Sequence, residues 1–124
     1  MIGNKLFVDT NILIYLLNGD QEVTQILEGK QLAISIITEL ELLAIPNLSA
    51  GEQKIIEELI GECQIISISS GIKKIAVEFR KTRKLKLPDA IVAASAFYSK
   101  LPLFTADKAF DRIQELDVII YAVE

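Results

Sequence analysis

The chain has 124 residues, of which 51% are hydrophobic and 24% charged, the size and composition of one globular domain. It contains no histidine and a single cysteine, which excludes Ser-His-Asp and Cys-His mechanisms, zinc sites with histidine ligands and an internal disulfide. No secretory signal and no apolar stretch of about 18 residues is visible. We therefore expect one domain over residues 1–124, cytoplasmic and without a membrane partner.

The charge is distributed unevenly. The net charge of −4 opposes tight binding of a polyanion through overall electrostatics. One window of the sequence nevertheless carries seven cations against one acid, Glu78. The cations are Lys73, Lys74, Arg80, Lys81, Arg83, Lys84 and Lys86. This window is either a surface that holds a polyanion or a solvated helix face, and the sequence leaves both interpretations open.

Short apolar segments alternate with segments of helical periodicity along the chain. In chain order we predict a strand at 6–8, helices at 11–17 and 22–27, a strand at 32–36, helices at 36–44 and 50–60, a strand at 64–68, helices at 70–83 and 88–99, a strand at 103–105, a helical turn at 107–113 and a strand at 118–121. This alternation predicts an α/β fold, a three-layer α/β/α domain with a central parallel sheet of about five strands.

Several residues mark where the predicted helices begin and end. Gly19 and Gly29 follow the first two helices, and Ser49 with Glu52 fits a capping box before the fourth. Ser69 or Ser70 is expected to cap the long helix that ends near residue 83. Pro88 is expected at the first position of the next helix, where its missing N–H costs nothing.

Two aspartates follow predicted strands. Asp9 comes directly after the first strand, and Asp107 lies two residues after Thr105, the last residue of the fourth. Ligands of open α/β sheets bind beyond the carboxyl ends of the strands, so we expect both aspartates at that edge. Each also has an ordinary structural explanation, since Asp9 could simply cap the next helix and Asp107 could be a turn residue.

Glu41 and Asp89 lie on helices with strongly apolar faces. At 100° per residue Glu41 falls within the apolar arc centred on Ile37, whereas Glu39 falls on the opposite side. We therefore expect Glu41 to point inward, where a carboxylate needs a partner or a metal. The alternative is a glutamate at the edge of the buried face, with its tip in water. Asp89 stands in the first turn of an apolar helix, whose dipole holds it ionised.

Four acids on one rim would repel one another without a cation. Because all the available donors are oxygens, the expected cation is Mg²⁺ or Mn²⁺ rather than zinc or copper. We expect the carboxylates of Asp9, Glu41 and Asp89 to lie roughly 4 to 6 Å apart in the metal-free protein.

Four motifs now match a known family, in that family's order across nearly the whole chain. They are Phe7-Val8-Asp9-Thr10-Asn11-Ile12-Leu13, Ser35-Ile36-Ile37-Thr38-Glu39-Leu40-Glu41-Leu42, Leu87-Pro88-Asp89-Ala90-Ile91-Val92-Ala93-Ala94 and Phe104-Thr105-Ala106-Asp107-Lys108-Ala109-Phe110. The chain resembles a PIN-domain ribonuclease of the VapC toxin class.

The resemblance implies a metal-dependent endoribonuclease that hydrolyses RNA phosphodiester bonds, forms a homodimer and is inhibited by an antitoxin. It gives acidic, metal-binding roles to Asp9, Glu41, Asp89 and Asp107, with Thr105 as a supporting polar residue. One position departs from the family pattern: many relatives carry an acid directly before the aromatic of the last motif, where this chain has Ala109. Asp107 is therefore expected to be the fourth acid, with Asp111 as a substitute.

Under this hypothesis one or two Mg²⁺ or Mn²⁺ ions activate a water and stabilise the charge of the scissile phosphate. The residues expected to hold the RNA backbone are Arg80, Arg83, Lys84 and Lys86. Apolar residues exceed what one face of each helix must bury, which also favours a homodimer. They are Ile12, Ile14, Tyr15, Leu17 and those within 36–45.

Two other functions are compatible with this length and layout. A phosphorylation-driven receiver domain would need an acceptor aspartate after the third strand, where the chain reads Ile65-Ile66-Ser67-Ile68-Ser69. A PIN-like module that binds RNA or protein without cleaving it would not need all four acids. An RNA cleavage assay with and without EDTA separates this second alternative from the enzyme.

Overall fold

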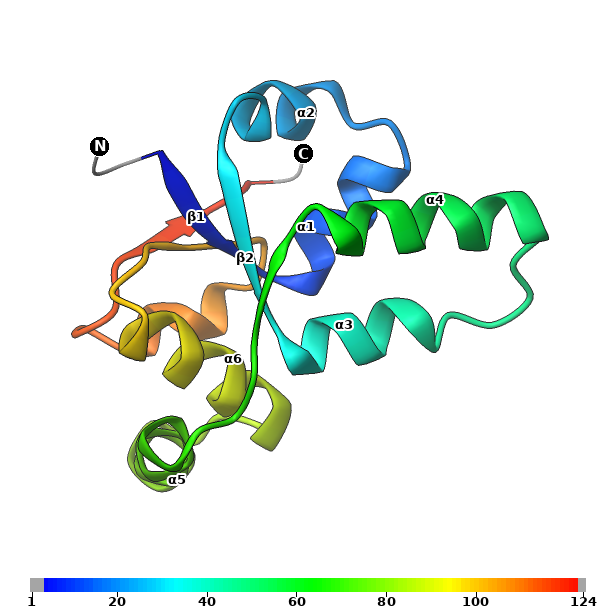
Figure 1. Cartoon of the computed structure of the whole chain (residues 1–124). Coiled ribbons are helices and arrows are strands. Elements are labelled where there is room, and N and C mark those ends of the chain that lie inside the picture. Colours follow the sequence, from blue (N-terminus) through cyan, green and yellow to red (C-terminus); the bar gives the residue numbers. More distant parts are fainter. Residues whose placement is uncertain (1–3, 123–124) are drawn as a thin grey trace.

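The computed structural model describes residues 4–122, which form a single parallel sheet with helices on both faces (Figure 1). The strands are β1 (Lys5–Val8), β2 (Gln31–Ser35), β3 (Gln64–Ile66), β4 (Leu103–Thr105) and β5 (Val118–Ile120). The helices are α1 (Thr10–Leu17), α2 (Gln21–Leu27), α3 (Ile36–Leu43), α4 (Ala50–Gly61), α5 (Ser70–Arg83), α6 (Leu87–Tyr98) and the short 3₁₀ helix η1 (Lys108–Arg112).

Alternate residues of the strands supply two separate cores. In β1, Phe7 faces a core built with α5, α6 and η1, whereas Leu6 and Val8 face a core built with α1, α2 and α4. Both faces of the sheet are covered, as parallel sheets require. The predicted three-layer α/β/α fold is confirmed. No helix within residues 4–122 is long and apolar enough to cross a membrane.

The strand order is β3-β2-β1-β4-β5, and all neighbouring strands are parallel. The chain moves from β1 outward to β2 and β3, then returns to the other side of β1 to form β4 and β5. The order therefore reverses between β1 and β4, and their carboxyl ends flank the crevice where such sheets bind ligands. A backbone hydrogen bond from Asp9 N–H to the Phe104 carbonyl oxygen, at 3.0 Å, joins the two strands at this point.

The same order rules out the receiver-domain alternative. Receiver domains have the strand order 2-1-3-4-5, which puts the third strand beside the first at the functional end. Here β3 is the edge strand next to β2, and β4 occupies the place beside β1. The segment after β3 therefore lies away from the crevice.

The predicted elements are confirmed, with small shifts at their ends. β3 ends at Ile66 instead of residue 68, and the turn predicted at 107–113 is the 3₁₀ helix η1. The chain enters α6 one residue earlier than predicted, with Lys86 as its N-cap. Pro88 is consequently the second residue of α6 and Asp89 the third, still within the first turn, where the helix dipole favours a carboxylate.

Candidate active site

The Asp9 carboxylate lies at the crevice between β1 and β4, and its residue is only 8% exposed. Asp9 caps α1 through a 2.9 Å hydrogen bond from the Thr10 N–H to Oδ1. Burial is the main reason why the pKa of Asp9 is raised to about 6, and the negative charges of Asp89 and Glu41 add to the effect. The hydrogen bonds from Thr105 and Thr10 lower the pKa and partly oppose that rise.

Two polar side chains fix Asp9 against β4. The Thr105 hydroxyl, fully buried, donates a 2.7 Å hydrogen bond to Asp9 Oδ2 and accepts one from the Asp107 N–H at 3.1 Å. The Asn11 side-chain amide donates to Asp9 Oδ2 at 3.3 Å, while its carbonyl oxygen accepts from the Ala106 N–H at 3.1 Å. The supporting place predicted for Thr105 matches this geometry. Asn11 has an equivalent place that the sequence prediction did not assign.

Glu41 meets the site through threonine hydroxyls. Its Oε1 lies 2.6 Å from the Thr10 hydroxyl, which is in turn 2.9 Å from the buried Thr38 hydroxyl. The side chain of Glu41 is exposed, and Glu39 is the more buried of the two glutamates. The expectation that Glu41 points into the interior is therefore wrong. The buried residues of α3 are Thr38 and Leu42, and the helix runs from the end of β2 alongside α4 (Figure 1).

Asp89 and Asp107 complete the acidic rim. Asp89 is partly buried on the first turn of α6. Burial is the main reason why the pKa of Asp89 is raised, and the negative charges of Asp107 and Glu41 add to the rise. The positive charge of Lys86 lowers the pKa and opposes that rise. Asp107 caps η1 through a 2.9 Å hydrogen bond from the Ala109 N–H. The turn interpretation of Asp107 is thus correct, and its charge also reaches Asp89. That proximity favours Asp107 over Asp111 as the fourth acid.

The acids are electrostatic neighbours, but they do not form a ready-made metal cage. Within residues 4–122, no three acidic or cysteine side chains are already gathered closely enough to hold a metal ion. The spacing of 4 to 6 Å among Asp9, Glu41 and Asp89 stays a prediction. Asp9, Glu41 and Asp107 accept hydrogen bonds from hydroxyl, amide and N–H donors. Their all-oxygen chemistry fits Mg²⁺ or Mn²⁺.

The basic window divides into two parts. Arg83 is engaged within the fold, because its guanidinium is ion-paired with Glu115 and lies 5.6 Å from the centre of the Phe79 ring. By contrast, Arg80, Lys84 and Lys86 are exposed. Lys86 acts on the charge of Asp89, so it lies at the acidic rim.

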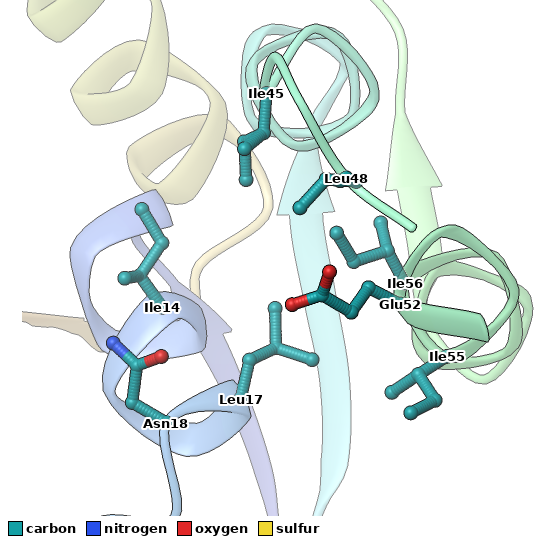
Figure 2. Close-up of a pocket in the computed structure, with 8 residues that line it drawn as sticks. All are labelled: Ile14, Leu17, Asn18, Ile45, Leu48, Glu52, Ile55 and Ile56. Carbon is teal, nitrogen blue, oxygen red and sulfur yellow. The ribbon is translucent and has the colours of Figure 1, made fainter. Parts of the chain in front are cut away.

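An apolar groove of about 230 Å³ lies between α1 and the segment that runs from the end of α3 into α4 (Figure 2). Its lining is apolar apart from Asn18 and Glu52, and Glu52 is held in the capping box with Ser49. Ile14 and Ile55 contribute exposed apolar surface to this groove. It lacks the paired titratable groups of the acidic rim and has the character of a protein-binding surface rather than a reaction site.

Comparisons with known proteins agree with the fold and the motifs. The PIN domain family model matches residues 6–116. Ribonuclease VapC2 of Methanocaldococcus jannaschii is 28% identical, over 96% of this chain and 95% of that protein. A chain in a toxin-antitoxin complex from Klebsiella pneumoniae is 36% identical with a TM-score of 0.82, covering 95% of this chain and 99% of that one. VapBC-1 from nontypeable Haemophilus influenzae gives 25% identity and a TM-score of 0.77, covering 94% and 97%.

The strand order of this parallel sheet reverses between β1 and β4. Carboxylates that follow β1 and β4 or lie on α3 and α6 are electrostatic neighbours at this switch point. These features define the protein as an α/β domain with an acidic site at the switch point. The match over residues 6–116 is more specific: the chain belongs to the PIN-domain family. The resemblance drawn from the four sequence motifs is confirmed.

The raised pKa of Asp9 predicts a pH-dependent stability difference between the metal-free wild type and Asp9→Asn. The folded pKa of about 6 exceeds the ordinary value of 3.8, so between pH 4 and pH 6 the unfolded state ionises while the folded state still holds its proton. The wild type should therefore lose stability relative to Asp9→Asn as pH rises through this window, by roughly 3 kcal/mol in total.

Denaturant unfolding of both proteins in EDTA at pH 4 and pH 7.5 measures this change. The asparagine also alters the hydrogen bonds to Thr105 and Asn11, but that cost shifts both pH values together. A difference that stays constant with pH would show that Asp9 titrates normally.

Proposed function

We propose that the protein is a divalent-metal-dependent endoribonuclease and the toxin of a toxin–antitoxin pair. The observation that carries the proposal is the buried Asp9 carboxylate at the switch point, electrostatically coupled to Asp89 and Glu41. Burying a carboxylate beside two others is costly unless a cation is bound there. The similarity to a ribonuclease and to a toxin-antitoxin complex supports RNA as the substrate and an antitoxin as the partner.

Asp9, Glu41 and Asp89 would hold Mg²⁺ or Mn²⁺, with Asp107 as the fourth acid. The bound cation would supply an activated water and charge neutralisation at the scissile phosphate. Thr105 and Asn11 orient the Asp9 carboxylate, and the Thr10 hydroxyl orients that of Glu41. The burial of Asp9 and the partial burial of Asp89 strengthen their attraction for a cation over that of surface carboxylates.

Cleavage of RNA by the purified protein should require Mg²⁺ or Mn²⁺ and stop on addition of EDTA. Glu41→Gln should lower the rate by at least roughly 100-fold, because even residues that only support metal ligands cost 10- to 100-fold when replaced. Glu39→Gln is the matched control, the same change on the same helix outside the acidic rim, and should leave the rate unchanged. Cleavage that survives EDTA would refute the proposal. A wild type that binds Mn²⁺ and RNA without cleaving would identify the non-catalytic binding module.

The exposed cations near the acidic rim are the candidates for holding RNA phosphates on either side of the cleavage point. Lys86 lies near Asp89. Lys84, two residues before Lys86, is the C-cap of α5, and Arg80 lies one helical turn earlier. Arg83 is a weaker candidate than the sequence indicated, because its ion pair with Glu115 would have to break.

Replacing both Lys84 and Lys86 with alanine should weaken RNA binding and flatten the slope of log K against log salt by about 1.4, since each single-strand phosphate contact contributes roughly 0.7. Lys73→Ala with Lys74→Ala removes the same charge at the far end of α5 and should change the slope little. Filter binding at several salt concentrations measures both. Equal slopes for the two double variants would mean that the window is only a solvated helix face.

An antitoxin partner needs a surface on this chain, and the apolar groove between α1 and α4 is the one we assign to it. Exposed isoleucines in a groove suit the apolar face of a partner's helix. The related chain from Klebsiella pneumoniae, in a toxin-antitoxin complex, covers 95% of this chain and so includes the region that forms the groove.

We also propose a homodimer. Of the apolar residues expected to be in surplus, Ile12 is fully buried in the core, whereas Leu40 and Leu43 of α3 remain 55% and 48% exposed. Leu87, at the start of α6, is 55% exposed. These leucines lie on the two helices that carry Glu41 and Asp89, so a dimer formed through them would border the acidic rim.

Light scattering at tens of micromolar should give a mass near twice 13.8 kDa for the wild type. Leu40→Glu with Leu43→Glu should give the monomer mass, because a charge within an apolar interface loses its water without gaining a partner. Val77→Glu, at a similarly exposed position on α5, should stay dimeric. A monomeric wild type would remove the homodimer from the account.

A further inference from the structure

Thr38 is a polar residue whose hydroxyl is buried inside the fold. It lies in the first turn of α3, one helical turn before Glu41, and its side chain has no exposure to solvent. Its hydroxyl is 2.9 Å from the Thr10 hydroxyl on α1. That contact joins two helices whose starting residues are fixed by the ends of β1 and β2.

The direction of the hydrogen bonds follows from counting protons. The Thr10 hydroxyl has one proton and two neighbouring oxygens, Glu41 Oε1 at 2.6 Å and Thr38 Oγ1 at 2.9 Å. Hydrogen bonds to a carboxylate are shorter and stronger than those between neutral groups, so the Thr10 proton goes to Glu41. The Thr38 hydroxyl then donates to the Thr10 oxygen, and the three groups form a directed chain that ends on the carboxylate.

Glu41 needs such a chain because it is exposed. A free glutamate side chain on a helix surface samples several rotamers, and fixing it on a cation costs conformational entropy. The hydroxyl chain fixes the carboxylate beside Thr10, the residue that follows Asp9. Hydrogen bonds in a chain also polarise one another, so the buried Thr38 strengthens the Thr10–Glu41 bond that it does not itself make.

We propose that Thr38 is a positioning residue that orients Glu41 for divalent-cation binding through the Thr10 hydroxyl. The inference rests on the proposed metal-dependent function. It assigns to a fully buried threonine a role in metal affinity, distinct from any role in packing α3 against α1.

Calorimetric titration of Mn²⁺ into the metal-free protein tests this inference without any activity assay. Thr38→Val keeps the shape of the side chain and removes the hydroxyl, and it should weaken Mn²⁺ binding roughly tenfold, as the loss of groups that support metal ligands does. Thr38→Ser restores the hydroxyl and should bind Mn²⁺ within about twofold of the wild type. In a Glu41→Gln background, Thr38→Val should cause no further loss, because the residue through which it acts is already changed.

The matched control is Ser95→Ala, which removes another fully buried hydroxyl, one that donates to the Ile91 carbonyl oxygen within α6 at 2.7 Å. It should lower the melting temperature and leave Mn²⁺ affinity unchanged. If Thr38→Val fails to fold, Thr10→Val removes the middle hydroxyl instead and should weaken Mn²⁺ binding similarly.

The two proposals fail in different ways. Equal Mn²⁺ affinity for the wild type, Thr38→Val and Thr10→Val would overturn the positioning role and leave the metal site intact. An equal loss in Thr38→Ser and Thr38→Val would also overturn it, by showing that packing and not the hydroxyl matters. A wild type that does not bind Mn²⁺ would overturn the proposed function and the positioning role together.

Discussion

The Asp9 carboxylate is removed from water at the point where β1 and β4 part, and an ionised group in such a place costs free energy unless it is paired. Three hydrogen-bond donors offset part of this cost: the Thr10 N–H, the Thr105 hydroxyl and the Asn11 side-chain amide. These donors come from α1 and from the end of β4, so they also fasten the two sides of the switch point together. The raised pKa of Asp9 shows that they compensate only part of the cost.

The remaining elements bring further negative charge to a place that already disfavours it. α3 starts from β2 and delivers Glu41, and α6 crosses to deliver Asp89 in its first turn. Asp9 also caps α1, but this role does not explain why Glu41 and Asp89 lie near it. The proposed cation would offset this repulsion, and it would also connect the fold to phosphodiester chemistry. The apolar groove between α1 and α4 and the exposed leucines of α3 are the surfaces proposed for association with other chains.

Much of this arrangement could be predicted from the sequence because it depends on local rules. The strand–helix alternation gave the layers, and the switch-point rule placed Asp9 and Asp107 at one edge. Periodicity wrongly placed Glu41 on the buried face of α3, because a repeat along one helix does not show which other elements cover that face. The Thr10–Thr38 contact and the ion pair of Arg83 join residues 28 and 32 positions apart, which no local pattern could indicate. The only sign of a role for Thr38 in the sequence was its place one helical turn before Glu41.

The carboxylates of Asp9, Glu41 and Asp89 are proposed to share one divalent cation, or an adjacent pair, at the switch point. A crystal structure grown in Mn²⁺, with the ion located by its anomalous scattering, tests the claim most directly. We expect one Mn²⁺ site or an adjacent pair at the switch point, ligated by Asp9, Glu41 and Asp89. Manganese bound elsewhere, or a crevice that stays free of manganese with Glu41 turned to solvent, would contradict the account.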